Sequence, residues 1–146
     1  MTTEAQVLEC GIREGFSVLI PFGNRDSYDQ VWDVDGKLLK IQVKTASLCK
    51  KNGEVRDNVI KFPCIVNRNG VIHKYGDDID FFATVWDNVC YLVPSSECSI
   101  EKRLRLNTEG LPEHLLPFTC MAKDYECRTV LKRYGYLTEE EDEVLK

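Results

Sequence analysis

The pattern of hydrophobic and polar positions near the N-terminus predicts one helix followed by one strand. Apolar residues recur at helical spacing over Glu4–Glu14, Thr2 or Thr3 stands where an N-cap is needed, and Gly15 follows as a stop signal. The apolar run Val18–Phe22 ends at a glycine and is typical of a short strand. We therefore expect the chain to open with a short helix and a strand.

Three dipeptides of turn-forming residues divide the next part of the chain into hairpins. Asp35-Gly36, Asn52-Gly53 and Asn69-Gly70 each stand between runs rich in β-branched and apolar residues, which is typical of two-residue type I′ turns. Besides the strands on either side of Asp35-Gly36, short strands are expected at residues 55–66, 71–75, 81–87 and 88–94.

The pattern changes beyond Ser95. Residues 99–106 are basic and amphipathic, and Met121–Leu137 has the apolar spacing of a helix. We therefore expect one domain over residues 1–146, with a core at 4–94 and a helical C-terminal extension at 99–146. The predicted fold class is α+β, a mixed β-sheet with flanking helices.

The hairpin around Asp35-Gly36 brings polar side chains together. If Val34 pairs with Lys37 across a two-residue turn, the same register places Asp29 opposite Gln42, with Cβ atoms about 4.5–5.5 Å apart. Lys44 lies on the face of Gln42, because side chains alternate along a strand. The residues on the other face point into a core: Leu39, Ile41 and Val43. A carboxylate, an amide and an ammonium on one face can hold a divalent metal and a water beside a positive charge, as metal-dependent phosphodiester cleavage requires.

These residues resemble the motif of the PD-(D/E)xK nuclease superfamily, in particular the small endonucleases encoded within group I introns. The resemblance spans residues 4–94 and rests on an ordered set of segments. They are Glu4-Ala5 with the helix after it, residues 15–23, Tyr28-Asp29, residues 41–45, residues 78–83 and residues 91–94. The order Pro-Phe-Gly, Tyr-Asp and Gln-Val-Lys-Thr is more specific than a lone D…QxK pattern.

The resemblance implies a restriction-endonuclease-like fold and a role for each residue of the site. Asp29 is then the central ligand of Mg²⁺, for which Mn²⁺ substitutes, and the backbone carbonyl of Val43 is a further ligand. Gln42 stands where the wider superfamily more often has Glu or Asp, so its neutral amide adds no charge. Lys44 orients or activates the attacking water, and Glu4 on the first helix supports the metal or its waters. On local sequence alone, Asp29 as a strand-terminating residue and Lys44 as a solvated lysine are the alternatives.

The charge distribution is uneven along the chain. The net charge is −5, yet residues 37–74 contain nine basic and two acidic residues, a local balance of +7. This basic part can neutralise phosphates, although a solvated lysine-rich face that protects strand edges is the alternative. The candidate DNA contacts are Lys50, Lys51, Arg56, Lys61 and Arg68, with Lys102, Arg103 and Arg105 as further candidates. The acidic segment 139–143 carries opposing charge.

Two other groups of residues are possible metal ligands. The seven cysteines contain no C-x-x-C pair, so reduced buried thiols are the preferred interpretation, with a zinc site of Cys120, Cys127 and His114 as the alternative. Among Asp77, Asp78 and Asp80, the last two can share a strand face. The position of these aspartates before Phe81-Phe82-Ala83 favours a turn that leads into a buried strand.

The expected function is that of a magnesium-dependent DNA endonuclease, of the site-specific homing type. Cutting both strands of a duplex requires two active sites, so the resemblance implies a homodimer or a homotetramer. A Holliday-junction resolvase of the same superfamily and a catalytically inactive DNA-binding relative are the alternatives. No phosphate-binding glycine loop and no membrane-length apolar run is present, so we expect a cytoplasmic protein without a nucleotide cofactor.

Overall fold

The computed structural model describes residues 1–23 and 27–138, apart from the side chains of Arg56, Asp57 and Arg68. The helices are α1 (Thr3–Arg13), α2 (Cys127–Arg133) and the 3-10 helices η1 (Gly76–Asp78), η2 (Ser95–Glu97), η3 (Glu113–Phe118) and η4 (Ala122–Tyr125). The strands are β1 (Ser17–Leu19), β2 (Gln30–Val34), β3 (Lys37–Val43), β4 (Ser47–Lys51), β5 (Glu54–Pro63), β6 (Ile65–Arg68), β7 (Val71–Lys74), β8 (Phe81–Trp86), β9 (Val89–Pro94) and β10 (Glu101–Arg105).

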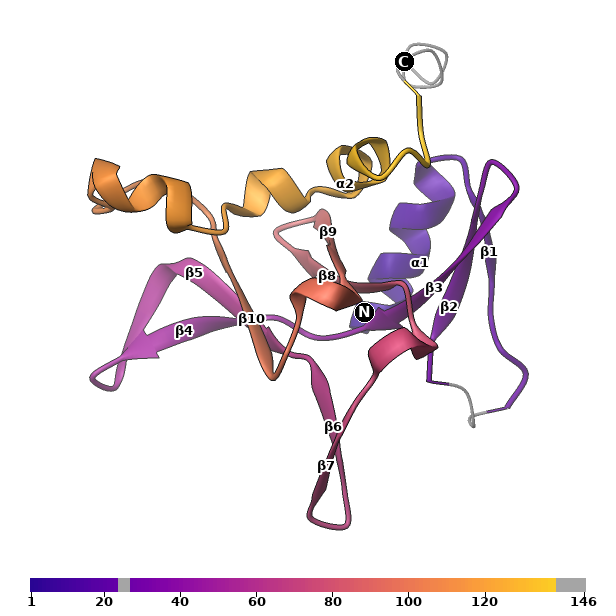
Figure 1. The fold of residues 1–146 in the computed structure, drawn as a ribbon, viewed down its shortest axis with the longest axis horizontal. Helices are drawn as coiled ribbons and strands as arrows, with labels where there is room; N and C mark the ends of the chain where they lie inside the picture. The colour runs from indigo at the N-terminus through magenta and orange to yellow at the C-terminus, as the bar shows by residue number, and fades with distance from the viewer. Residues whose placement is uncertain (24–26, 139–146) are drawn as a thin grey trace.

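The strands form a mixed central sheet and two smaller antiparallel sheets. The central sheet has the order β1-β2-β3-β8-β9, in which only β3 and β8 are parallel. The strands β10-β5-β4 form a second sheet, and β6 and β7 form a two-stranded sheet. Figure 1 shows the β6–β7 hairpin, which we call the β6–β7 ribbon (residues 65–74), extending away from the rest of the molecule. No helix in the described part of the chain is both long and apolar enough to cross a membrane.

The predicted hairpins are confirmed, and their turns have the expected backbone. Asp35 and Gly36 have φ values of 53° and 86°, and the first residue of each of the Asn-Gly turns also has a φ of 53°. Val34 pairs with Lys37 and Gln30 with Ile41, which is the register predicted from the sequence. Both central residues of a type I′ turn need a positive φ, which Asn, Asp and Gly tolerate best.

Helix α1 covers one face of the central sheet. The Thr2 side chain accepts a hydrogen bond from the Ala5 backbone N–H, so the predicted N-cap is confirmed. Val7 and Trp32 are fully buried between helix and sheet. A Cβ atom on Gly11 would lie 2.9 Å from Val18 Cγ2, so this close approach of helix and sheet depends on glycine.

The C-terminal part is less helical than predicted. Residues 101–105 form strand β10, which pairs with β5, so the expectation of a helical extension from residue 99 is wrong there. Buried and exposed residues alternate here, as in a strand: Lys102 and Leu104 are buried while Glu101 and Arg103 are exposed. The helix expected over Met121–Leu137 is divided into η4 and α2.

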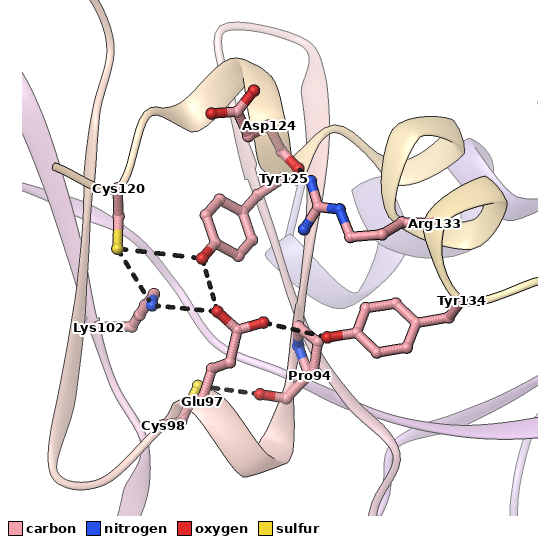
Figure 2. Close-up of polar contacts among 9 residues, drawn as sticks. All are labelled: Pro94, Glu97, Cys98, Lys102, Cys120, Asp124, Tyr125, Arg133 and Tyr134. Atoms are coloured by element: carbon pink, nitrogen blue, oxygen red, sulfur yellow. Dashed lines mark hydrogen bonds and ion pairs between the residues drawn. The ribbon is translucent and has the colours of Figure 1, made fainter. Parts of the chain in front are cut away.

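A polar cluster fastens this C-terminal part to the sheet. Glu97 on η2 accepts hydrogen bonds from the hydroxyls of Tyr125 at 2.6 Å and Tyr134 at 3.3 Å, and forms an ion pair with Lys102 at 3.9 Å (Figure 2). The Lys102 ammonium also donates to Cys120 Sγ at 3.5 Å. Burial, together with the negative charge of Glu97, raises the pKa of Tyr134. We call these five residues the Glu97 cluster; they connect the β9–β10 segment to η4 and the end of α2.

Candidate active site

The carboxylate of Asp29 is held at the open end of the β2–β3 hairpin. Its backbone N–H donates to the carbonyl of Ile41 at 2.9 Å, and its Oδ2 accepts from the backbone N–H of Val43, also at 2.9 Å. The ladder between β2 and β3 ends with Gln30 opposite Ile41, so the predicted pairing of Asp29 with Gln42 lies just beyond its last pair. Two hydrogen bonds therefore fix Asp29 next to the end of β3, and one of them is accepted by Oδ2.

The backbone carbonyl of Val43 faces the same edge of β3 as Asp29. The N–H and C=O groups of one strand residue point to the same side, and the Val43 N–H points to Asp29. Strand β2 begins at Gln30, so the ladder between β2 and β3 does not extend to Val43. A carboxylate oxygen of Asp29 and the carbonyl oxygen of Val43 are thus brought together where the strand pairing ends.

Glu4 approaches this edge from the first turn of α1. The side-chain amide of Gln30 donates to the Glu4 carbonyl at 2.8 Å, and the Thr3 hydroxyl lies 2.8 Å from the Thr45 hydroxyl. Partial burial raises the pKa of Glu4, and the nearby negative charge of Asp29 raises it further. The structure thus brings the predicted Glu4 carboxylate near Asp29, where their mutual repulsion favours a bound cation.

The ammonium of Lys44, the residue after β3, is held by Ile65 and Tyr75. Gln42 pairs with Phe82 of β8, and Lys44 follows two residues later on the same face. Its Nζ donates to the hydroxyl of Tyr75 at 2.8 Å and to the carbonyl of Ile65 at 3.4 Å, and lies 4.8 Å from the centre of the Tyr75 ring. Gln42 and Lys44 are both half-buried.

Asp78 and Asp80 have structural roles, as the sequence favoured. Asp80 precedes β8 and accepts from the backbone N–H of Lys40 at 2.8 Å, while its own N–H donates to the Lys40 carbonyl at 2.9 Å. These bonds begin the pairing of the two parallel strands. Asp78 accepts from the Ser27 hydroxyl at 3.5 Å. Asp77 lies with Asp78 on η1 and is exposed.

The thiols are not arranged as a metal site within residues 1–23 and 27–138. All cysteines are free, and no group of three His, Cys, Asp or Glu side chains there could hold a metal. Cys120 belongs to the Glu97 cluster, whereas Cys127 lines a cavity of about 210 Å³ together with Cys10 and Cys90. The alternative zinc site of Cys120, Cys127 and His114 is therefore not formed.

The first five predicted DNA-contacting residues lie on strands β4, β5 and β6. Lys50 and Lys51 are exposed on β4, and Lys61 on β5 lies 3.8 Å from the carboxylate of Glu101. Arg56 and Arg68 belong to β5 and β6, but their side chains lie outside the described part of the structure.

Two of the three further candidates are buried. Lys102 is 8% exposed and lies in the Glu97 cluster. Arg105 is 9% exposed, and its guanidinium donates to the backbone carbonyls of Asn107 and Glu109. Arg103 alone is exposed, and it pairs with Glu101 at 2.8 Å. The acidic segment 139–143 lies outside the described residues.

A known family matches most of the chain that carries this site. A family model described as PD-(D/E)XK endonuclease matches residues 2–115. This chain belongs to the PD-(D/E)XK endonuclease family. The solved structure of the bacterial homing endonuclease I-Ssp6803I is similar, with a TM-score of 0.67 and 25% sequence identity over 93% of this chain and 94% of that chain. No curated protein sequence matches. The predicted resemblance and the α+β fold are thereby confirmed.

The donor atoms at Asp29 suit the divalent ions that PD-(D/E)XK nucleases generally use. A carboxylate oxygen, the Val43 carbonyl and the Gln42 amide are hard oxygen donors, of the kind that Mg²⁺ and Mn²⁺ prefer. Two carboxylates, Asp29 and Glu4, supply the negative charge. The residues present therefore fit a small divalent cation.

Two supporting residues of this PD-(D/E)XK endonuclease were missed in the sequence. Gln30 is 1% exposed; it ties α1 to β2 through the Glu4 carbonyl and accepts from the Trp32 indole N–H at 3.2 Å. The sequence could have indicated Gln30, because a polar residue there alternates with Trp32 and Val34 on the strand face that points into the core. Tyr75, which holds the Lys44 ammonium, gave no comparable signal, since its partner is 31 residues away.

Proposed function

We propose that this nuclease hydrolyses phosphodiester bonds of double-stranded DNA at a site formed by Asp29, Gln42, Lys44 and Glu4, with Mg²⁺ as cofactor and Mn²⁺ as a substitute. The observation that carries the proposal is the hydrogen bond from the Val43 N–H to Asp29 Oδ2 at 2.9 Å. It fixes a carboxylate at the end of β3, on the edge that the Val43 carbonyl faces, and the Gln42 amide is proposed to complete the set of donors.

Each residue of the site has a chemical task. Asp29, Gln42 and the Val43 carbonyl hold the metal ion, which when bound polarises the phosphoryl oxygen and acidifies water. The Lys44 ammonium positions the attacking water and stabilises negative charge that develops on the phosphoryl oxygens. The Glu4 carboxylate would accept a hydrogen bond from water at the site and so orient it.

DNA binding is assigned to the basic side chains and to the β6–β7 ribbon. Lys50 and Lys51 are exposed and can pair with phosphates, and Arg56, Lys61 and Arg68 are proposed to do the same. Every residue of β7 is exposed, and a two-stranded antiparallel ribbon fits the major groove of B-DNA. The root of the ribbon contacts Lys44, so a DNA strand along it can reach the site.

The homing role and the oligomeric state follow from similarity and from symmetry. The match to a homing endonuclease extends over nearly the whole of both chains, which supports cleavage of a specific duplex site. Each chain has one such site, so cutting both strands requires a homodimer or a homotetramer, with a palindromic or pseudo-palindromic target.

The test is cleavage of a panel of long duplex DNA and a synthetic four-way junction, with Mg²⁺ or EDTA. Wild type is compared with Asp29→Asn and Lys44→Ala; Asp35→Asn in the exposed turn of the same hairpin and Lys123→Ala on η4 are the controls. We expect Mg²⁺-dependent cutting of duplex DNA that only the first two variants lose. Preference for the junction regardless of sequence would indicate a resolvase. Salt-sensitive binding without cutting under any divalent ion would indicate the inactive DNA-binding relative.

A further inference from the structure

The ammonium of Lys44 is held by the root of the β6–β7 ribbon. Ile65, whose carbonyl accepts from Lys44 Nζ at 3.4 Å, is the first residue of β6 and pairs with Lys74 of β7. Tyr75 directly follows β7, and its hydroxyl lies 2.8 Å from the same Nζ. Both contacts of the ammonium therefore come from the two strand ends that close the ribbon.

Tyr75 is itself fixed against the sheet. Its ring packs edge-on against Phe82, with ring centres 5.4 Å apart and planes at 85°. Phe82 is 2% exposed and pairs with Gln42 across the parallel ladder. Tyr75 is half-buried, whereas all of β7 is exposed, so the root of the ribbon is anchored while its strands lie in solvent.

These contacts hold the ammonium without neutralising it. An ammonium has three donors and no acceptor, and here the Tyr75 hydroxyl and the Ile65 carbonyl are neutral partners. A carboxylate in the same place would form an ion pair and compete with a phosphate for the charge. A tyrosine fixes the position of Nζ and leaves its full positive charge available.

We propose that Tyr75 is a positioning residue for Lys44, which it holds in place through its hydroxyl. This inference rests on the proposed function, in which Lys44 acts on water and the phosphoryl group. Loss of the hydroxyl leaves the charge of Lys44 and the DNA-binding surface intact but widens the range of positions that Nζ occupies.

The test compares wild type with Tyr75→Phe, which keeps the ring, and Tyr75→Leu, which removes it. Tyr136→Phe is the matched control, because a lysine, Lys37, also lies over the Tyr136 ring, at 5.2 Å. We expect Tyr75→Phe to lower kcat about tenfold, the effect of a hydrogen bond to a charged group, with KM, DNA affinity and Tm unchanged. Tyr75→Leu lowers kcat further, and Tyr136→Phe leaves it unchanged.

A second readout separates positioning from general stability. The Lys44 ammonium resonance in NMR spectra reports how tightly Nζ is held, and we expect it to broaden or vanish in Tyr75→Phe while the backbone spectrum stays that of wild type. Wild-type cutting with an unchanged kcat in Tyr75→Phe overturns this inference alone, as does a loss of kcat that merely follows a lower Tm. A wild type that cuts no DNA overturns the proposed function and this inference with it.

Discussion

Lys44 and Lys102 lie against tyrosine rings at nearly the same distance, yet they belong to different kinds of site. Their Nζ atoms are 4.8 Å from the Tyr75 ring and 5.0 Å from the Tyr125 ring. The Lys102 side chain is 10% exposed and forms an ion pair with Glu97. Lys44 forms no ion pair with any carboxylate among the described residues. The same pair of residue types, a lysine and a tyrosine, therefore forms a structural contact at Lys102, where a carboxylate neutralises the ammonium. At Lys44, where no described carboxylate does so, the positive charge stays available.

The largest difference in cleavage rate is expected between the variants Lys44→Ala and Lys102→Ala. Lys44→Ala should lower the rate of single-turnover DNA cleavage by about 100-fold or more, because its charge acts on the transition state. It should lower the free energy of unfolding by no more than about 1 kcal/mol, since its partners are neutral. Quench-flow cleavage and chemical denaturation measure both quantities. An unchanged cleavage rate in Lys44→Ala would contradict a catalytic role for the Lys44 ammonium.

Lys102→Ala should show the opposite balance. It leaves Glu97 without its cation and removes a buried aliphatic chain, so we expect the free energy of unfolding to fall by about 2 kcal/mol. Cleavage per folded molecule should remain at the wild-type rate. Arg103→Ala, on the same strand but exposed, is the control and should change stability by less than about 0.5 kcal/mol.

The exposed lysines of β4 should affect binding rather than chemistry. The double variant Lys50→Ala, Lys51→Ala should reduce the slope of log affinity against log salt by about 2, because each lysine neutralises one phosphate. The rate at saturating DNA should not change. Fluorescence anisotropy across a salt series measures the slope, and a wild-type slope in the variant would remove Lys50 and Lys51 from the interface.

The smallest effect is expected at Glu4. Burial and the charge of Asp29 raise the pKa of Glu4 in the folded protein above its ordinary value of 4.5. Any stability that Glu4 contributes is therefore present at low pH, and it is lost as the pH rises through the pKa of the folded state. At neutral pH without metal, Glu4→Gln should therefore raise Tm slightly, and the difference should vanish below pH 4. With Mg²⁺ present, wild type should have the higher Tm of the two. Scanning calorimetry with EDTA or Mg²⁺ checks both signs.

The hairpin of the site could be predicted from the sequence because its geometry is local. A two-residue Asp-Gly turn fixes the register, and the alternation of side chains then sets which residues share a face. This reasoning predicts where Asp29, Gln42 and Lys44 lie, and the structure confirms the register from Val34–Lys37 to Gln30–Ile41. The family resemblance, rather than the local pattern, singles out Glu4.

The partners of the lysines could not be predicted, because they depend on contacts between distant segments. Tyr75 reaches Lys44 only because β3 and β8 are parallel neighbours and the ribbon closes between them. The charge pattern assigns Lys102 to a basic surface, although its aliphatic chain is buried and its ammonium meets Glu97. The helix expected over Met121–Leu137 is interrupted at Glu126, whose backbone is extended and bridges to Tyr91.

The most direct test of the metal site is the affinity for Mn²⁺, measured by titration calorimetry of wild type, Asp29→Asn and the control Asp35→Asn. We expect wild type and Asp35→Asn to bind Mn²⁺ equally, and Asp29→Asn to bind at least about tenfold more weakly. Gln42→Glu should bind more tightly than wild type, because it adds a charged oxygen beside Asp29. Equal Mn²⁺ affinity in wild type and Asp29→Asn would contradict the assignment of the site.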